Sequence, residues 1–156
     1  MDSAKKVTTT GKGSLFADKN KYDKDAIYKA VSSFIDEYND TVGAMGSVSN
    51  TSVKNAGNSM TRMTGIMSNS LAKVGITIGA DGKMSIDEET FENADVSRVK
   101  SLFNGSSSYA GAISSYASRI ASQASNQMSR VNGSLYGSNG SFYNGYSSGS
   151  LYNGFF

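Results

Sequence analysis

The sequence lacks both cysteine and histidine. Without cysteine the chain can form no disulfide, has no thiol nucleophile and has no zinc or iron–sulfur site built on thiolates. Without histidine it lacks the commonest general base and the commonest metal ligand, so no catalytic triad that uses an imidazole is possible. Carboxylates, lysine, tyrosine and serine are the groups that remain. We therefore expect a protein that is not an enzyme, with no catalytic residues, no cofactor and no metal.

The sequence also lacks a long apolar run and an excess of charge of one sign. No run approaches the ~20 apolar residues that span a bilayer, and no apolar stretch typical of a signal peptide follows Met1. The chain has 15 Lys and Arg against 13 Asp and Glu, and a formal net charge of +2. A nucleic-acid partner needs a clustered basic surface. We expect no membrane span, no nucleic-acid partner, and either a cytoplasmic location or export without a cleaved signal.

Apolar residues are scarce, at 38% of the 156 residues, while glycine, serine and asparagine are common. The length suits one domain. Because the composition changes along the chain, we expect three parts: a flexible leader over residues 1–21, a helical domain over residues 22–131, and a disordered tail over residues 132–156.

Apolar residues recur at helical spacing in three stretches, which predicts three longer helices. The first stretch, residues 23–45, carries Ile27, Val31, Phe34, Ile35, Tyr38, Val42 and Met45. The second, residues 51–73, carries Val53, Ala56, Met60, Met63, Met67 and Leu71. The third, residues 107–131, carries Tyr109, Ile113, Tyr116, Ile120, Ala124, Gln127 and Val131. We expect a mainly α fold, with these helices in an antiparallel bundle.

The segment between the second and third stretches predicts a β-hairpin and two short helices. Residues 75–87 alternate in polarity around a Gly-Ala-Asp-Gly turn, with Ile76, Ile78, Met84 and Ile86 as candidates for the buried side. Asp87 is expected to cap a short helix anchored by Phe91, and a second short helix is expected over Val96–Phe103.

Six acidic residues in this segment are candidates for a metal site or for acid–base catalysis. They are Asp81, Asp87, Glu88, Glu89, Glu92 and Asp95. A calcium loop with Gly82 at its sixth position would place Thr77 and Gly79 where carboxylates are needed. A pair of carboxylates for acid–base catalysis needs a shielded pocket that separates their pKa values, and nothing in the sequence indicates one. Turn and cap roles account for these acids better.

The three apolar stripes have two interpretations. They can form the core of this protein, or part of a stripe can stay open and contact a partner or a second copy. Both can hold together. The residues expected to contact a protein partner are Val53, Met60, Met63, Met67, Ile113, Tyr116 and Ile120.

Two segments resemble the C-terminal part of the bacterial flagellar filament cap protein, hook-associated protein 2. The first is Phe34-Ile35-Asp36-Glu37-Tyr38-Asn39, which is similar to that family's Phe-(Val/Ile)-x-x-Tyr-Asn helix. The second runs from Leu71 to Glu88 and is similar to the pattern Leu-x-x-(Ile/Val)-Gly-Ile…Asp-Gly-x-(Leu/Met)-x-(Leu/Ile)-Asp. The resemblance covers about residues 20–105. It implies a truncated relative of the cap protein.

The resemblance implies a structural or assembly protein of the flagellum that acts through helix–helix, coiled-coil-like contacts with itself or with flagellar axial proteins. It also implies an extracellular or flagellum-associated location. The alternative is a surface or adhesive module. In that case the tail, which repeats Gly-Ser-(Leu/Phe)-Tyr after Asn132, would bind glycan or cell wall.

Overall fold

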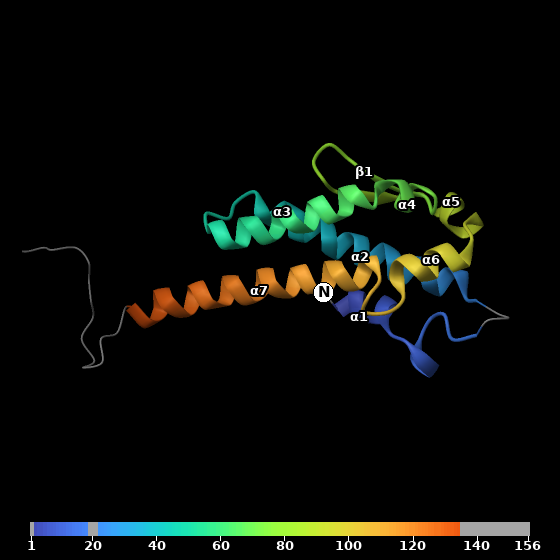
Figure 1. Cartoon of the computed structure of the whole chain (residues 1–156), viewed down its shortest axis with the longest axis horizontal. Coiled ribbons are helices and arrows are strands. Elements are labelled where there is room, and N and C mark those ends of the chain that lie inside the picture. The colour runs from blue at the N-terminus through green and yellow to red at the C-terminus, as the bar shows by residue number, and fades with distance from the viewer. Residues whose placement is uncertain (1, 19–21, 135–156) are drawn as a thin grey trace, which may run out of the picture. The chain divides into compact units, whose positions relative to one another are not determined.

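A computed structural model describes residues 2–18 and 22–134, with side chains from Ser3 to residue 126. This part of the chain is mainly helical, with seven α-helices, one 3-10 turn and one two-stranded antiparallel sheet (Figure 1). The prediction of a mainly α fold with a small hairpin is confirmed, and the antiparallel order of the longer helices stays a prediction. Residues 1–121 form one compact unit and residues 122–156 a second. The packing described below is that of the first unit.

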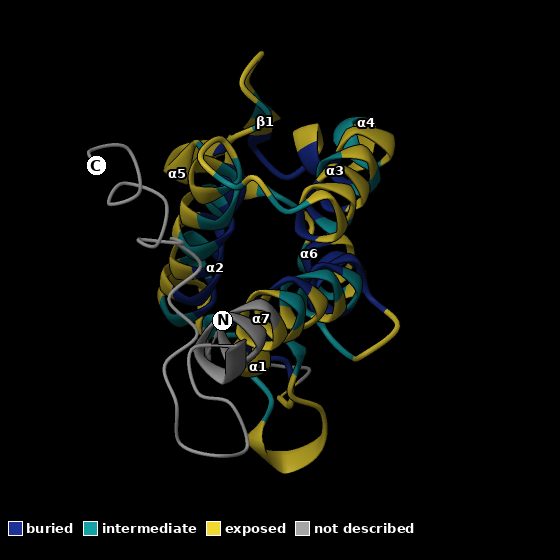
Figure 2. Cartoon of the chain, turned by 90° about the vertical axis from the view of Figure 1, so that its left-hand side faces the viewer, coloured by how far each residue is buried: buried dark blue, intermediate teal, exposed yellow. Residues whose placement is uncertain are grey.

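Helix α2, Lys24–Met45, lies at the centre of this unit and packs against α1, α3, α5 and β2. It begins where the sequence predicts, because the Asp23 carboxylate accepts a hydrogen bond of 2.9 Å from the backbone N–H of Ala26. Its buried residues are Ile27, Ala30, Val31, Phe34, Ile35 and Tyr38. These follow the expected stripe, and Figure 2 shows the buried side of α2 facing the interior.

The expected leader over residues 1–21 contains a short helix and buried side chains in its described part, while the division of the chain into leader, helical domain and tail stays a prediction. Asp2–Thr8 form helix α1, which packs against α2, and a 3-10 turn follows over Gly11–Gly13. Ala4, Val7 and Phe16 are all buried. Three apolar residues are too few to show helical periodicity, and it is the surface of α2 that gives them somewhere to pack.

The second apolar stripe is divided between two helices, α3 over Thr51–Ile66 and α4 over Ser68–Ala72. The expected continuous helix over residues 51–73 is therefore interrupted at Met67, whose φ of −87° and ψ of 0° end α3. The N–H of Met67 bonds to both Met63 O and Thr64 O, as is common at the end of a helix. Gly65, two residues earlier, weakens the last turn.

The hairpin pairs β1, Ile76–Ile78, with β2, Met84–Ile86, so that Ile76 faces Ile86 and Ile78 faces Met84. Ile76 and Met84 are buried, while Ile78 and Ile86 are half-buried. Of the four residues expected on the buried side, two reach the core directly and two pack at its edge.

Three helices follow the hairpin: α5 over Glu88–Asn93, α6 over Val96–Phe103 and α7 over Tyr109–Ser134. Phe91 is buried as expected, as are Val99, Leu102 and Phe103. Helix α7 begins two residues later than predicted and continues past residue 131.

An aromatic cluster closes the core where α2, α6 and α7 meet. The rings of Phe34, Phe103 and Tyr109 contact one another edge to face, with centroid distances of 5.8, 6.2 and 6.3 Å. This geometry places the positive edge of one ring against the negative face of the next. The cluster joins α2 to α6 and α7, which follow it by more than 50 residues in the sequence.

Candidate interaction surface

The seven residues expected to contact a partner divide into two groups. Val53, Met60, Ile113 and Ile120 are buried, so their side chains belong to the core of this chain. Met63, Met67 and Tyr116 are half-buried and keep part of their surface accessible. The core interpretation of the stripes thus accounts for the first group. Of the seven residues, only those in the second group keep surface that a partner could contact.

Ile66 is the exposed apolar residue that the stripe did not include. It is 70% exposed, and no other large apolar side chain in the described part of the chain is classed as exposed. Ile66 follows Met63 by three residues, which places both on neighbouring parts of the α3 surface. Because the apolar stripe counts only the positions expected to face inward, the spacing of residues does not predict that Ile66 lies beside it. We call Met63, Ile66 and Met67 the α3 ridge.

Asn39 joins α2 to the hairpin, because its side-chain amide pairs with the backbone N–H and carbonyl of one strand residue. Its side-chain N–H donates to the carbonyl of Met84 at 2.8 Å, and its side-chain oxygen accepts from the N–H of Met84 at 2.7 Å. The hydroxyl of the preceding Tyr38 donates to the carbonyl of Gly82 at 3.1 Å. The two segments singled out in the sequence, Phe34–Asn39 and Leu71–Glu88, therefore form one contact.

Glycines in the second segment hold backbone conformations that other residues rarely adopt. Gly75 and Gly82 both have a φ of +76°. A Cβ on Gly75 would also lie 3.0 Å from the carbonyl oxygen of Asp87 and from the N–H nitrogen of Phe91. The close approach of the first strand to α5 thus requires glycine at this position.

The acidic residues near the hairpin have local structural roles. Asp87 accepts a hydrogen bond of 2.8 Å from the N–H of Thr90 and caps α5. A hydrogen bond from the Thr90 side chain, together with this backbone bond, holds the pKa of Asp87 below its ordinary value. Asp95 caps α6 through the N–H of Ser97 at 2.8 Å, and Asp81 accepts from the N–H of Lys83 at 3.1 Å. Within residues 2–18 and 22–134, no three acidic side chains gather as a metal site would need.

Two buried tyrosines are held neutral. Burial raises the pKa of Tyr109 strongly and raises that of Tyr38 as well. A phenol with a raised pKa carries no charge near neutral pH and is a poor proton acceptor. Both hydroxyls instead make structural hydrogen bonds.

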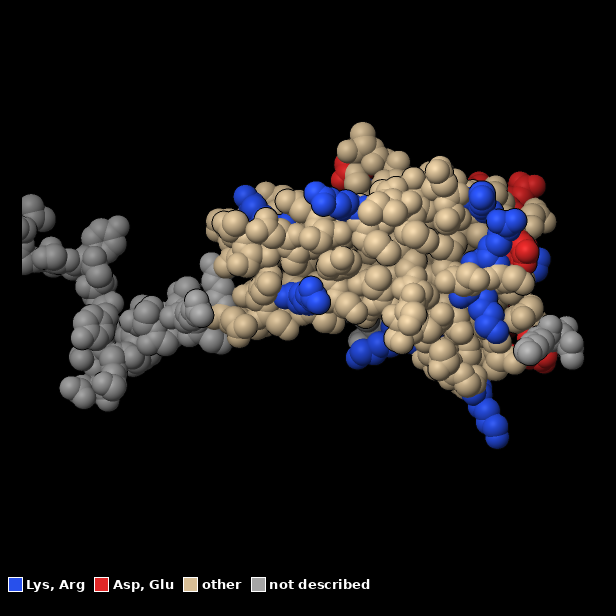
Figure 3. All heavy atoms as spheres, viewed as in Figure 1, with Lys and Arg blue, Asp and Glu red and all other residues tan. Residues whose placement is uncertain are grey.

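Charge is distributed unevenly along the chain. No acidic residue lies between Asp40 and Asp81 or after Asp95, so lysine and arginine are the only charged side chains in α3, α6 and α7, and α4 has no charged side chain. On the face viewed in Figure 3, basic atoms are scattered and acidic atoms lie at the margins, including the hairpin turn and α5.

Two further observations concern the remaining expectations. In the described residues, no helix is both long and apolar enough to cross a membrane. Of the tail expected over residues 132–156, the part from residue 135 onward lies outside the described residues. The structure therefore leaves the glycan-binding alternative as a prediction.

Comparison with known proteins assigns the chain to a family. A family model described as the flagellar hook-associated protein 2 C-terminus matches residues 67–148, just over half of the chain. The match includes Leu71–Glu88, α5, α6 and the described part of α7. Neither the curated proteins nor the solved structures gave a significant match. Because this match covers more than half of the chain, the chain belongs to the family of the flagellar hook-associated protein 2 C-terminus.

Proposed function

We propose that this protein is a structural or assembly component of the bacterial flagellum that acts through helix–helix contacts with protein partners. The observation that carries the proposal is the family match over residues 67–148. Within the matched stretch, Gly75 and Gly82 shape the backbone and Asp87 caps a helix. Such residues maintain a scaffold, and a scaffold supports assembly rather than turnover of a substrate.

The α3 ridge is the surface proposed for a helix–helix contact. Met63, Ile66 and Met67 lie along one side of the end of α3, and Ile66 is largely exposed. Methionine adapts to the shape of a partner because its side chain is unbranched and flexible. An exposed isoleucine between two methionines therefore suits a helix that packs along the ridge.

The proposed location is the flagellum, outside the cell, reached without a cleaved signal. Family membership supports this location, since the partners of a hook-associated protein are flagellar proteins. The proposed partners are axial proteins of the flagellum or further copies of this chain.

Co-sedimentation with purified hooks and filaments tests the proposal. The full chain is mixed with sheared filaments and intact hook–filament particles, and the pelleted fraction is measured against the chain alone. We expect the chain to pellet with the particles. Failure to pellet at any concentration, with the fold verified by circular dichroism, would contradict a flagellar role.

A pair of variants tests the ridge separately. Ile66→Ser removes the exposed apolar surface, whereas Ile66→Met preserves it. We expect Ile66→Ser to pellet less and Ile66→Met to pellet as the wild type does. If both variants pellet equally, the contact lies elsewhere, although the flagellar association itself would stand.

A further inference from the structure

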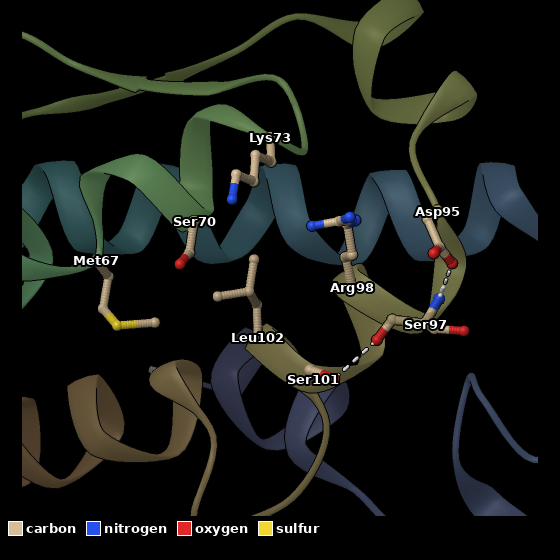
Figure 4. A pocket seen from close by; sticks show the side chains of 8 residues that line it. All are labelled: Met67, Ser70, Lys73, Asp95, Ser97, Arg98, Ser101 and Leu102. Atoms are coloured by element: carbon tan, nitrogen blue, oxygen red, sulfur yellow. Dashed lines mark hydrogen bonds between the residues drawn. The ribbon is translucent and has the colours of Figure 1, made fainter.

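A cleft lies between α4 and α6, with a volume of about 410 Å³. Figure 4 shows its lining: Met67, Ser70, Lys73, Asp95, Ser97, Arg98, Ser101 and Leu102. Leu102 is buried and Met67 half-buried, so apolar surface lies beside polar groups. A volume of this size accommodates a few side chains of a peptide and falls in the range of ligand pockets.

Two cations point into this cleft. Lys73, the residue that ends α4, and Arg98 on α6 extend toward the same space from opposite sides (Figure 4). Both are exposed, and the structure shows no ion pair to either from the described residues. Two like charges on either side of a cleft repel each other, so an anion between them gains from both.

The one carboxylate in the lining has another role. Asp95 lies at the start of α6 and accepts the 2.8 Å bond from the N–H of Ser97 that caps the helix. The elements that form the cleft otherwise carry no acidic residue. The cleft thus has two cations and one carboxylate, and that carboxylate is already bonded to the helix.

We propose that this cleft binds an acidic peptide segment of a partner protein. Lys73 and Arg98 receive its carboxylates, and Met67 and Leu102 contact an adjacent apolar side chain. The inference rests on the proposed function, because it names the chemistry of one protein contact. A peptide fits better than a nucleic acid because the lining offers no aromatic ring on which a base would stack.

Titration of the isotope-labelled full chain with a synthetic peptide tests the proposal. The probe is a capped Glu-Leu-Glu-Glu-Leu-Glu peptide, and its control replaces every glutamate by glutamine. We expect amide chemical shifts to change within residues 67–73 and 97–102 with the acidic peptide and not with the control. Because exposed ion pairs are screened by salt, the effect should weaken as salt is added.

A charge-matched pair of variants assigns the cations. The test variant combines Lys73→Glu with Arg98→Glu and so reverses the charge of both cations in the cleft. The control variant combines Lys54→Glu with Arg119→Glu, which makes the same change in net charge on exposed residues outside the lining. We expect the first variant to weaken the affinity for the acidic peptide by about tenfold, and the second by less than about twofold. Amide spectra of both variants verify that the fold is retained.

The proposal would be overturned if both variants lost affinity for the acidic peptide equally, or if the glutamine peptide bound with equal affinity. Tighter binding of a single-stranded oligonucleotide at the same amides would overturn it as well. Shift changes at these amides on raising the protein concentration without peptide would identify a second copy as the occupant and contradict a separate partner. If the peptide fails to bind while the chain still pellets with flagellar particles, only this inference is wrong.

Discussion

The hydroxyl groups of Thr64 and Tyr109 lie 2.9 Å apart and join α3 to α7 across 45 residues of sequence. Thr64 also donates to the carbonyl of Met60 at 3.1 Å, and the Tyr109 hydroxyl lies 3.3 Å from the Met84 sulfur. Tyr109 therefore contacts the hairpin as well as α3, and its ring belongs to the aromatic cluster.

Replacing Tyr109 by phenylalanine should lower the free energy of unfolding by about 1 kcal/mol. The ring and its packing remain, and only the buried hydrogen bond is lost. Urea unfolding followed by circular dichroism measures the change. Tyr116→Phe is the matched control, because Tyr116 is half-exposed, and it should have little effect. Equal losses in the two variants would show that the Thr64 bond contributes nothing.

The stability of the protein should fall above about pH 10 because of the same tyrosine. Burial raises the pKa of Tyr109 above its ordinary value of 10.0, and Tyr38 shifts in the same direction. Above pH 10 the unfolded chain loses phenol protons that the folded chain keeps, so stability decreases with pH. Well below pH 10 the phenols are protonated in both the folded and the unfolded state, so these tyrosines contribute no pH dependence to the stability.

Urea midpoints between pH 8 and pH 11.5 measure this dependence. The decrease should be shallower in Tyr109→Phe, which lacks one of the shifted groups. A wild-type midpoint that stays constant over the whole range would contradict the burial of a neutral phenol.

Replacing Asn39 by alanine should destabilise the protein by about 2–3 kcal/mol, because two hydrogen bonds are lost and the Met84 backbone is left without them. Hydrogen exchange should show the largest loss of protection at the Met84 amide, which donates to Asn39. Asn69→Ala, at an exposed position of α4, serves as control and should change stability by less than about 0.5 kcal/mol. Unchanged protection at Met84 in Asn39→Ala would contradict this role for Asn39.

Two glycine-to-alanine substitutions should change stability in opposite directions. Gly75→Ala should cost about 2 kcal/mol or more, because the backbone has positive φ and the new Cβ would crowd the backbone of Asp87 and Phe91. Gly65→Ala should stabilise by roughly 0.5–1 kcal/mol, because Gly65 lies in α3 with open space around it. Thermal unfolding of both variants provides the measurement. Stabilisation by Gly75→Ala would contradict the close approach at that residue.

Much of the local structure could be predicted from the residues. The stripe from Ile27 to Tyr38 became the buried side of α2, and Asp23 and Asp87 cap the helices that they precede. The hairpin and α6 also lie where they were expected. These signals are local, because a cap bonds to backbone within three residues and a stripe repeats within a few turns.

Other features depended on surfaces that no local pattern reveals. Helix α1 has only Ala4 and Val7 on its buried side, and their burial depends on the adjacent surface of α2. The stripe of α3 could have contacted either its own core or a partner, and only packing shows that Val53 and Met60 are inside while Ile66 is outside.

The sequence by itself determined α2, the hairpin, α5 and α6, with the caps at Asp23 and Asp87, since these signals depend on neighbours along the chain. It also determined the scarcity of reactive side chains, which is a matter of composition. Only the tertiary structure decided which apolar residues are buried and which surfaces remain open. It also brought Lys73 and Arg98 to one cleft from separate helices. The physical reason is that burial, and the approach of charges that are distant in the sequence, depend on how far apart segments lie in three dimensions. The local spacing of residues along the chain does not specify that distance.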